Sequence, residues 1–358
     1  MNSNNYLIIM AGGIGSRFWP YSRNSKPKQF LDILGVGKSL IRLTFERFSA
    51  LCPPENVLVV TNDEYSRKVS EEIPELKEEQ ILAEPFRRNT APCIAYAAYK
   101  IRKENPDAVM IVAPSDHVIL EKEAFTSTIE YALDQARDKQ RLITIGIKPN
   151  RPETGFGYIQ YLDTEEGNLK KVKTFTEKPE RSLAEKFIES GDFVWNSGIF
   201  VWSVDAIINA FRKHLSEVAD TFEAISDQLS TSGEKNAIYE AYAHTTNISI
   251  DYGVMEKSPD VYVVLADFDW SDLGSWDALY DLSEKDEDGN AIRGKALVYN
   301  TTGTLIHGSE DHLIVAQGLD DYLVAVCRNV TVVCKRGNES QFREFLADVK
   351  DKKGKEFL

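Results

Sequence analysis

The chain has 358 residues, of which 42% are apolar and 27% are charged, and its formal net charge is −14. This composition is typical of a globular protein with a large core, and the negative charge excludes a general nucleic-acid or anionic-membrane surface. No apolar run approaches the ~18 residues of a membrane span, and the N-terminus lacks a signal-peptide pattern, so we expect a cytoplasmic protein. The 4 cysteines are widely spaced, which favours free thiols over disulfides or a zinc site.

The first half of the chain alternates between β-branched runs and helical patterns. Apolar residues fill consecutive positions, as in strands covered on both faces, at Tyr6–Met10, Val57–Thr61, Val109–Ala113 and Leu142–Ile147. An apolar spacing near 3.6 predicts helices at Ser39–Ala50, Asn89–Lys103 and Ala124–Lys139. The alternation predicts an α/β, Rossmann-like fold with a mixed, mainly parallel sheet and helices on both faces.

The middle of the chain mixes both kinds of pattern. We predict strands at Phe156–Tyr161, Lys171–Phe175 and Gly198–Trp202. We predict helices at Arg181–Ser190 and Ser203–Lys213, and we interpret the polar, helical stretch Glu217–Tyr242 as a lid or an outer layer.

The pattern changes after the acidic turn Glu284–Asn290. Short strands recur every ~8–10 residues, separated by Gly and Asn, at Ala296–Tyr299, Thr304–Ile306, Leu313–Ala316, Tyr322–Val326 and Val330–Val333. This spacing predicts a small β-helix or β-roll, closed by a terminal helix at Gln341–Val349. We therefore expect one domain over residues 1–290 and a second over 291–358.

The first predicted strand runs into a glycine-rich segment, Ala11-Gly-Gly-Ile-Gly-Ser-Arg17. Glycines after a strand let backbone N–H groups approach phosphate oxygens. A dinucleotide fingerprint fails because Phe18 takes the third glycine position, and a Walker A loop ending at Gly37-Lys38-Ser39 fails because Asp32 takes its first. The first 31 residues lack acidic side chains but carry Arg17, Arg23, Lys26 and Lys28, so the segment predicts a phosphate-bearing ligand.

The segment from Ala11 to Pro20, with Lys26-Pro-Lys-Gln-Phe30, resembles the sugar-phosphate nucleotidyltransferase family. The last residues of these two segments, Phe18-Trp-Pro20 and Pro27-Lys-Gln-Phe30, resemble the mannose-1-phosphate guanylyltransferase branch. Further similar motifs follow in the order of the family: Ala83–Pro92, Ala113–His117, Glu153–Tyr158, Phe175–Pro179, Trp195–Gly198 and Asp269–Trp276.

The resemblance implies an enzyme that joins mannose 1-phosphate to the GMP part of GTP, releasing pyrophosphate and giving GDP-mannose. It implies Mg²⁺ as the cofactor, with Asp116 and Asp272 as ligands, and Arg17 and Lys28 as catalytic cations. A few carboxylates plus substrate phosphates are the usual way of holding Mg²⁺. From the residues alone, a turn or helix-capping aspartate is the favoured interpretation of Asp116.

The resemblance also assigns binding residues. Those for the nucleotide are Ala11, Gly12, Gly13, Gly15, Ser16 and Asp116, with Glu84, Asn89 and Thr90 on the base side. Those for the sugar phosphate are Gly155, Tyr158, Glu177, Lys178, Asn196 and Asp251. From the residues alone, Asn89-Thr90 also reads as a helix N-cap, Glu177-Lys178 as a surface ion pair and Asn196 as an Asx-turn. Asp251 is assigned either to the sugar or to support of Asp272.

Other interpretations stay open at this point. The nearest is a related transferase for heptose 1-phosphate with GTP, or for glucose 1-phosphate with UTP or dTTP. The others are a non-catalytic nucleotide-sugar-binding subunit and a nicotinamide-dependent oxidoreductase, which the missing third glycine disfavours. Some family members continue into a cupin-like isomerase domain, which we do not expect here, and a homodimer through the β-helix is expected by analogy.

Overall fold

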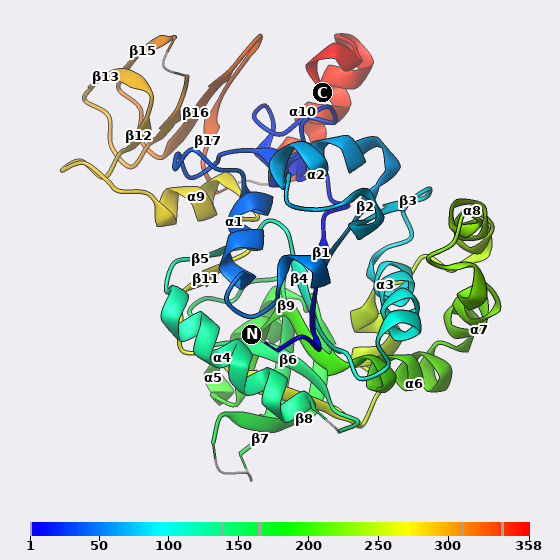
Figure 1. Ribbon diagram of the computed structural model, residues 1–358. Helices are drawn as coiled ribbons and strands as arrows, with labels where there is room; N and C mark the ends of the chain where they lie inside the picture. Colours follow the sequence, from blue (N-terminus) through cyan, green and yellow to red (C-terminus); the bar gives the residue numbers. More distant parts are fainter. Residues whose placement is uncertain (1, 138, 164–166, 310, 338–339) are drawn as a thin grey trace. The chain divides into compact units, whose positions relative to one another are not determined.

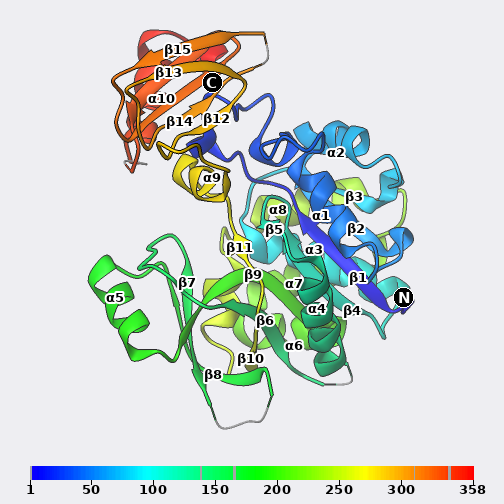
Figure 2. The same cartoon turned by 90° about the vertical axis from the view of Figure 1, so that its left-hand side faces the viewer.

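The computed structural model describes residues 2–137, 139–163, 167–309, 311–337 and 340–358. Its contacts divide the chain into two compact units, whose elements appear in Figures 1 and 2. The first unit contains the N-terminal segment up to Gly12, Ile41–Ser115 and Ile119–Trp270. The second unit contains Gly13–Leu40, Asp116–Val118 and Ser271–Leu358. The domain boundary at residue 290 stays a prediction, and the glycine-rich segment groups by contacts largely with the C-terminal part of the chain.

Among the described residues of the first unit, nine strands form one sheet in the order β3-β2-β1-β4-β9-β6-β10-β8-β7 (Figure 1). The strands are β1 Asn5–Met10, β2 Val57–Asn62, β3 Ile81–Glu84, β4 Val109–Pro114, β6 Leu142–Ile147, β7 Gly157–Leu162, β8 Leu169–Glu177, β9 Phe193–Ser203 and β10 Val261–Leu265. Strands β1 to β4 pair in parallel, whereas β9 runs antiparallel between β4 and β6. The predicted mixed sheet is confirmed.

Helices cover both faces of this sheet (Figures 1 and 2). They are α1 Leu40–Phe48, α2 Ser66–Glu72, α3 Thr90–Glu104, α4 Lys122–Ala136, α5 Arg181–Ser190, α6 Val204–His214, α7 Ser216–Ala224 and α8 Glu234–His244. The stretch predicted as a lid or an outer layer forms α7 and α8, which bury Phe222 and Tyr242 against Tyr96 of α3. It is therefore an outer layer. Helix α4 ends at Ala136, and residue 138 of the predicted helix lies outside the described residues.

The core explains why the parallel strands read as continuous apolar runs. Ile8 and Val60 belong to the cluster that packs against α3, α6 and α7. Their neighbours Leu7, Ile9 and Val59 are equally buried but point to the opposite face, because side chains alternate along a strand. Both faces of these strands are thus covered, which favours apolar residues at every position.

The C-terminal strands of the second unit stack in parallel coils (Figure 2). Strands β12 Ala291–Arg293, β14 Leu305–His307 and β16 Tyr322–Cys327 form one wall, and β13 Lys295–Tyr299 pairs with β15 Leu313–Gln317 in another. Strand β17 Val330–Lys335 returns antiparallel to β16, and Ile306, Ala316 and Val324 fill the interior. The predicted β-helix is confirmed. Helix α9 Trp276–Leu282 precedes it, and α10 Ser340–Lys352 follows it. Two short strands remain, β5 Val118–Ile119 and β11 Trp270–Ser271. Each spans a point at which the sequence passes from one unit to the other.

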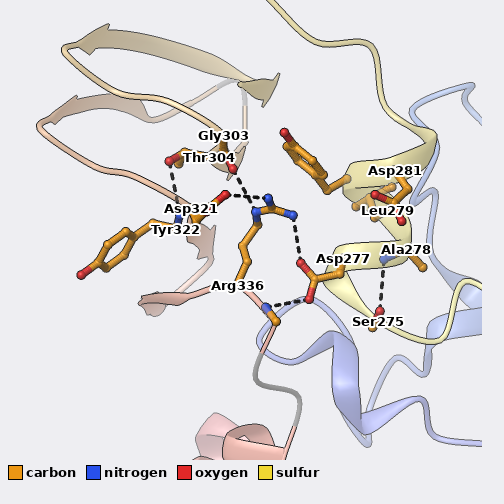
Figure 3. Close-up of polar contacts among 12 residues, drawn as sticks. Ser275, Asp277, Ala278, Leu279, Asp281, Gly303, Thr304, Asp321, Tyr322 and Arg336 are labelled. Atoms are coloured by element: carbon orange, nitrogen blue, oxygen red, sulfur yellow. Dashed lines mark hydrogen bonds and ion pairs between the residues drawn. The ribbon is translucent and has the colours of Figure 1, made fainter. Parts of the chain in front are cut away.

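Arg336, just after β17, ties helix α9 to the β-helix within the second unit (Figure 3). Its Nε donates to the carbonyl of Gly303 at 2.9 Å, while Nη1 pairs with Asp277 at 3.0 Å and Nη2 with Asp321 at 3.1 Å. Asp277 stands in the first turn of α9, whose N-cap Ser275 accepts a hydrogen bond from Ala278 N. The N-terminus of α9 is therefore held by its Ser275 cap and by the ion pair of Asp277 with Arg336.

His307 is a buried histidine at the end of β14, with 1% of its surface exposed. Its ring lies edge-on to Tyr21 at 4.5 Å and to Trp276 at 5.3 Å, and neither ring nitrogen has a hydrogen-bond partner among the described residues. Burial, aided by the charge of Arg293, lowers the pKa of His307 from 6.5 to about 3. The folded protein therefore keeps this ring neutral where an unfolded chain would protonate it.

We predict that this histidine makes the fold sensitive to acid. Because the pKa of His307 is lower in the folded state, the free energy of unfolding decreases as the pH falls from 6.5 towards 3. Above pH 6.5 this histidine causes no such decrease. The loss is about 1.4 kcal/mol per pH unit in that window, or about 2 kcal/mol at pH 5. Urea unfolding of wild type and His307→Phe at pH 7.5 and pH 5 measures it. The variant should lose less stability on acidification, and an equal loss in both proteins would contradict the prediction.

Candidate active site

The glycine-rich segment begins in the first unit, where β1 ends. Ala11 is buried; its N–H donates to the carbonyl of Val60 at 2.8 Å, and its carbonyl accepts from the Thr61 hydroxyl at 2.9 Å. A Cβ on Gly12 would lie 3.6 Å from Glu84 Oε2, so the backbone passes close to that carboxylate. The strand end thus holds the start of the segment and brings Glu84 beside it.

The rest of the segment lies in the second unit. Gly15 has a φ of +67°, and a Cβ there would lie 2.4 Å from Lys28 Cβ, so both its conformation and its surroundings require glycine. Gln29 Nε2 donates to the carbonyl of Gly13 at 2.9 Å, which ties the turn to the Lys-Pro-Lys-Gln motif. Ser16 is exposed, and Arg17 is half-buried and lines a small cavity with Asp277 and other residues.

Lys28 is enclosed by oxygen atoms, with only 4% of its surface exposed. Its Nζ pairs with Asp116 Oδ2 at 2.8 Å and donates to the carbonyls of Asp272 at 2.8 Å and Leu273 at 2.9 Å. The turn that carries Asp272 is tight: Gly274 N donates to Asp272 Oδ1 at 3.0 Å, and a Cβ on Gly274 would lie 2.4 Å from Oδ2. Lys28 therefore joins the two aspartates that the sequence predicts as metal ligands.

The charge of Lys28 sets the ionisation of Asp116. Burial alone would raise the pKa of this carboxyl, but the charges of Lys28 and His117 and its hydrogen bonds hold the pKa below its usual value. Asp116 is thus ionised at neutral pH and pairs with Lys28.

The oxygen atoms around Lys28 Nζ are the Asp116 carboxylate and two main-chain carbonyls, whereas the Asp272 carboxylate accepts a hydrogen bond from Gly274 N. Carboxylate oxygens such as those of Asp116 and Asp272 are the type of ligand that Mg²⁺ prefers. In the described part of the chain, no three or more His, Cys, Asp or Glu side chains cluster as metal ligands. A site with Asp116 and Asp272 would consequently rely on substrate phosphates and water for its remaining ligands.

The predicted base-side residues lie in the first unit, at the end of β3 and the start of α3. Glu84 is buried, accepts a hydrogen bond from the Tyr242 hydroxyl at 2.9 Å, and has its pKa raised to about 7 by burial against the opposing effects of Tyr242 and Arg87. Asn89 is the N-cap of α3 and accepts from Thr90 N at 2.9 Å, and the Thr90 hydroxyl accepts from Ile250 N at 2.9 Å. The N-cap interpretation of Asn89 is therefore correct in this structure, whereas base contacts stay a prediction.

The predicted sugar-phosphate residues lie in the first unit, at the ends of β8 and β9 and in a π-helical turn. Lys178 has a φ of 48° and pairs with Glu177 at 2.6 Å, with 57% of the lysine side chain exposed and Glu177 largely buried. Burial alone would lower the pKa of Lys178, but the hydrogen bond and charge of Glu177 raise it above its usual value. The ion pair expected from the residues alone is thus present, but only its lysine reaches far into solvent.

Asn196 and Asp251 contact each other. Asn196 Nδ2 donates to Asp251 Oδ1 at 2.9 Å, and Asn196 Oδ1 accepts from Gly198 N at 3.2 Å, the Asx-type contact expected from the residues alone. Asp251 opens the π-helical turn Asp251–Met255, and burial together with the charge of Glu177 raises its pKa to about 7. Asp251 therefore contacts one of the predicted sugar-side residues, and both roles considered for it stay predictions.

Backbone contacts of the two remaining predicted residues, Gly155 and Tyr158, stay a prediction. The ring of Tyr158 is fully buried and packs on Phe187 at 5.4 Å, so its side chain is not available to a ligand. Gly155 N donates to Glu153 Oε1 at 3.0 Å.

Two residues near the predicted sugar side were missed by sequence reasoning. A Cβ on Gly157 would lie 2.5 Å from Glu177 Oε2, so this glycine lets the carboxylate approach β7. Thr144 of β6 donates a hydrogen bond to Asn196. Gly157 stands inside the Glu153–Tyr158 motif and could have been chosen from it, whereas Thr144 gave only the weak signal of a hydroxyl within an apolar strand.

A cavity of about 980 Å³ in the first unit is bordered by β3, α3 and α8. None of the predicted site residues lines it, although Ala83 and Pro85, the neighbours of Glu84, do. Its buried charges satisfy each other: Lys100 Nζ lies 2.7 Å from both oxygens of Glu234, which also accepts from the Tyr96 hydroxyl at 2.5 Å. This arrangement is that of a structural ion pair, and we do not take the cavity as the candidate site.

Comparison with known proteins identifies the family. The sequence model for nucleotidyl transferases matches residues 6–289. The chain belongs to the nucleotidyl transferase family. The predicted family is thus confirmed, and the chain is a nucleotidyltransferase.

Similar proteins match from about three quarters of the chain to nearly all of it. A mannose-1-phosphate guanylyltransferase of Klebsiella pneumoniae is 35% identical over 98% of this chain and 75% of its own length. A solved structure of a mannose-1-phosphate geranyltransferase from Thermus thermophilus superposes with a TM-score of 0.87 and is 31% identical, covering 97% of this chain and 99% of that one. A mannose-6-phosphate isomerase from Helicobacter pylori has a TM-score of 0.60 and 30% identity, covering 74% of this chain and 99% of that one.

Proposed function

We propose that the chain transfers GMP from GTP to α-D-mannose 1-phosphate and releases pyrophosphate and GDP-mannose. The observation that carries this proposal is the near full-length similarity to a mannose-1-phosphate guanylyltransferase, 35% identical over 356 residues. The local geometry supports the same reading, because the glycine-rich turn and the cationic Lys28 adjoin the two aspartates of the predicted metal site. Pyrophosphate release that needs both GTP and mannose 1-phosphate tests the proposal, and its absence from folded protein would contradict it.

The reaction we propose is a single in-line displacement. A phosphate oxygen of mannose 1-phosphate forms a bond to the α-phosphorus of GTP, and the bond from that phosphorus to the bridging β-phosphate oxygen breaks. The nucleophile is already an anion, so no general base is required. The enzyme must instead hold two anions together and stabilise a transition state crowded with negative charge, so positioning and electrostatics supply the catalysis.

The glycine-rich segment and its cations are proposed to hold the triphosphate. Backbone N–H groups from Gly12 to Ser16 would bind phosphate oxygens, which the lack of Cβ atoms at the three glycines permits, and Ala11, whose N–H donates to Val60, would hold the start of the segment. Arg17 would offer its forked donors to the transferring and leaving phosphates, and Lys28 a buried positive charge beside them. Mg²⁺ bound by Asp116 and Asp272 would neutralise phosphate charge.

The base and sugar would be held by residues of the first unit. Guanine offers N1–H and its amino group as donors, which a carboxylate such as Glu84 can accept, with Asn89 and Thr90 in the same segment. On the sugar side, Lys178 would bind the attacking phosphate through its largely exposed side chain, and Glu177 and Asn196 would bind hydroxyls. Asp251 would support this group through Asn196, and Gly155 and Tyr158 would contribute backbone contacts.

We further propose a cytoplasmic homodimer. The free cysteines suit a reducing compartment. In the described part of the chain, no helix has the length and apolar character that a membrane crossing would need.

For the dimer, the outer face of the β13–β15 pair exposes Leu297, Tyr299, Leu313 and Val315, and Leu297 and Val315 are direct neighbours across the two strands. Such a contiguous apolar patch favours association.

A change of charge on this face is expected to separate the subunits. Light scattering should give twice the chain mass of 40.4 kDa for the wild type and 40.4 kDa for the Leu297→Lys, Val315→Lys double variant. Leu183→Lys, which changes an exposed leucine on α5, is the control and should stay dimeric. A wild type of 40.4 kDa at micromolar concentration would refute the dimer, and a dimeric double variant would refute the proposed face.

A further inference from the structure

Asn196 stands at an irregularity in the pairing of β6 with β9. Thr144 pairs with Phe200 and Gly146 pairs with Asn196, so a two-residue step on β6 faces a four-residue step on β9. Gly198 takes up the extra length with a φ of +70°. A bulge of this kind turns a side chain out of the regular alternation of the strand. The direction of the Asn196 amide is consequently not fixed by the sheet itself and must be set by its contacts.

Those contacts define one orientation of the amide. Asn196 Oδ1 accepts from the Thr144 hydroxyl at 2.8 Å and from Gly198 N at 3.2 Å, while Nδ2 donates to Asp251 at 2.9 Å. A reversed amide would place its N–H groups against the Gly198 N–H and its oxygen against the Asp251 carboxylate. Thr144 is 0% exposed, so it has no surface on which a ligand or bulk water can act.

The residue type at position 144 is itself informative. Its neighbours Leu142, Ile143, Ile145 and Ile147 are apolar and buried, and valine would fill the same space as threonine without a polar atom. Burying a hydroxyl in such a strand costs free energy unless it forms hydrogen bonds. The Thr144 hydroxyl has one hydrogen to donate; Asn196 Oδ1 lies 2.8 Å away and the Ile199 carbonyl 3.3 Å away, so the side-chain oxygen is the closer acceptor.

We propose that Thr144 is a positioning residue for mannose 1-phosphate. Its hydroxyl holds the Asn196 side-chain amide so that the amide nitrogen faces Asp251 and the amide stays aligned with the other sugar-side residues. The inference rests on the proposed function, which makes Asn196 a sugar ligand. Thr144 itself does not touch the substrate. Its effect therefore belongs to sugar-phosphate binding and not to the nucleotide.

Steady-state kinetics of three variants test this role. Thr144→Val is expected to raise KM for mannose 1-phosphate about tenfold, the effect of losing one oriented hydrogen bond, with KM for GTP unchanged. Thr144→Ser keeps the hydroxyl and should restore most of the affinity. Thr245→Val is the matched control, because it removes another buried hydroxyl, bonded to the Ala241 carbonyl at 2.6 Å, and should leave both KM values unchanged. Unchanged KM for mannose 1-phosphate in folded Thr144→Val would overturn the proposal, as would an equal rise in both KM values.

A second measurement does not depend on activity. The side-chain amide protons of Asn196, assigned by their loss in Asn196→Ser, should exchange slowly in wild type and faster in Thr144→Val, but not in Thr245→Val. Unaltered exchange in Thr144→Val would overturn the positioning role even if the enzyme is active. An inactive wild type that still shows the expected exchange would instead overturn the proposed function and leave the orienting contact of Thr144 standing.

Discussion

Replacement of Lys28 by methionine is expected to lower turnover about a thousandfold, the scale of losing a charge that stabilises a phosphoryl transition state. Methionine keeps much of the apolar stem but removes the ammonium group that lies 2.8 Å from both Asp116 Oδ2 and the Asp272 carbonyl. Steady-state pyrophosphate release at saturating substrates measures the effect. Lys26→Met, which removes an exposed lysine of the same motif, is the control and should retain wild-type turnover.

The same substitution should also reduce stability, because it leaves Asp116 without its partner. The Asp116 side chain is 32% exposed, so water compensates in part, and we expect a loss of about 2 kcal/mol, less than for a fully buried pair. The double variant Lys28→Met, Asp116→Asn should recover part of this stability without recovering turnover. Turnover within tenfold of wild type in Lys28→Met would remove Lys28 from the catalytic group.

Replacement of Asp272 by asparagine is expected to raise the Mg²⁺ concentration for half-maximal activity at least tenfold. Asparagine keeps the shape of the turn, because its Oδ1 can still accept from Gly274 N, but it loses the negative charge that attracts a hard cation. Titration of activity with Mg²⁺ at saturating GTP and mannose 1-phosphate gives the value. Asp281→Asn, an exposed aspartate of α9, serves as the control. An unchanged Mg²⁺ requirement in Asp272→Asn would exclude its carboxylate from the metal site.

Much of the fold was readable from local patterns. Runs such as Tyr6–Met10 became β1 because a strand buried on both faces is apolar at every position. Strand β9 was harder: it was predicted to begin at Gly198 but begins at Phe193. The polar Asn196-Ser197-Gly198 sequence reads as a turn, and only pairing with β6 and β7 shows that the strand continues through a bulge.

The site was readable in its motifs but not in its contacts. Lys28 was expected as a catalytic cation near the glycine-rich segment, but its burial against Asp272, a partner 244 residues away, was not predicted. A local sequence pattern cannot predict a contact between residues so far apart in the sequence. Asn89 was expected either as a cap or as a base ligand, and its hydrogen bond to Thr90 N fulfils the first role. The roles of these residues toward substrates stay predictions.

Pyrophosphate release with Mg²⁺ distinguishes the proposed reaction from its alternatives when GTP, ATP, UTP and dTTP are each paired with mannose 1-phosphate, glucose 1-phosphate and a heptose 1-phosphate. We expect rapid turnover with GTP and mannose 1-phosphate and at most slow turnover with every other pair. Rapid turnover with a different pair would contradict the proposed base and sugar while leaving the family intact. No turnover with any pair, from protein shown to be folded, would contradict the proposed activity itself.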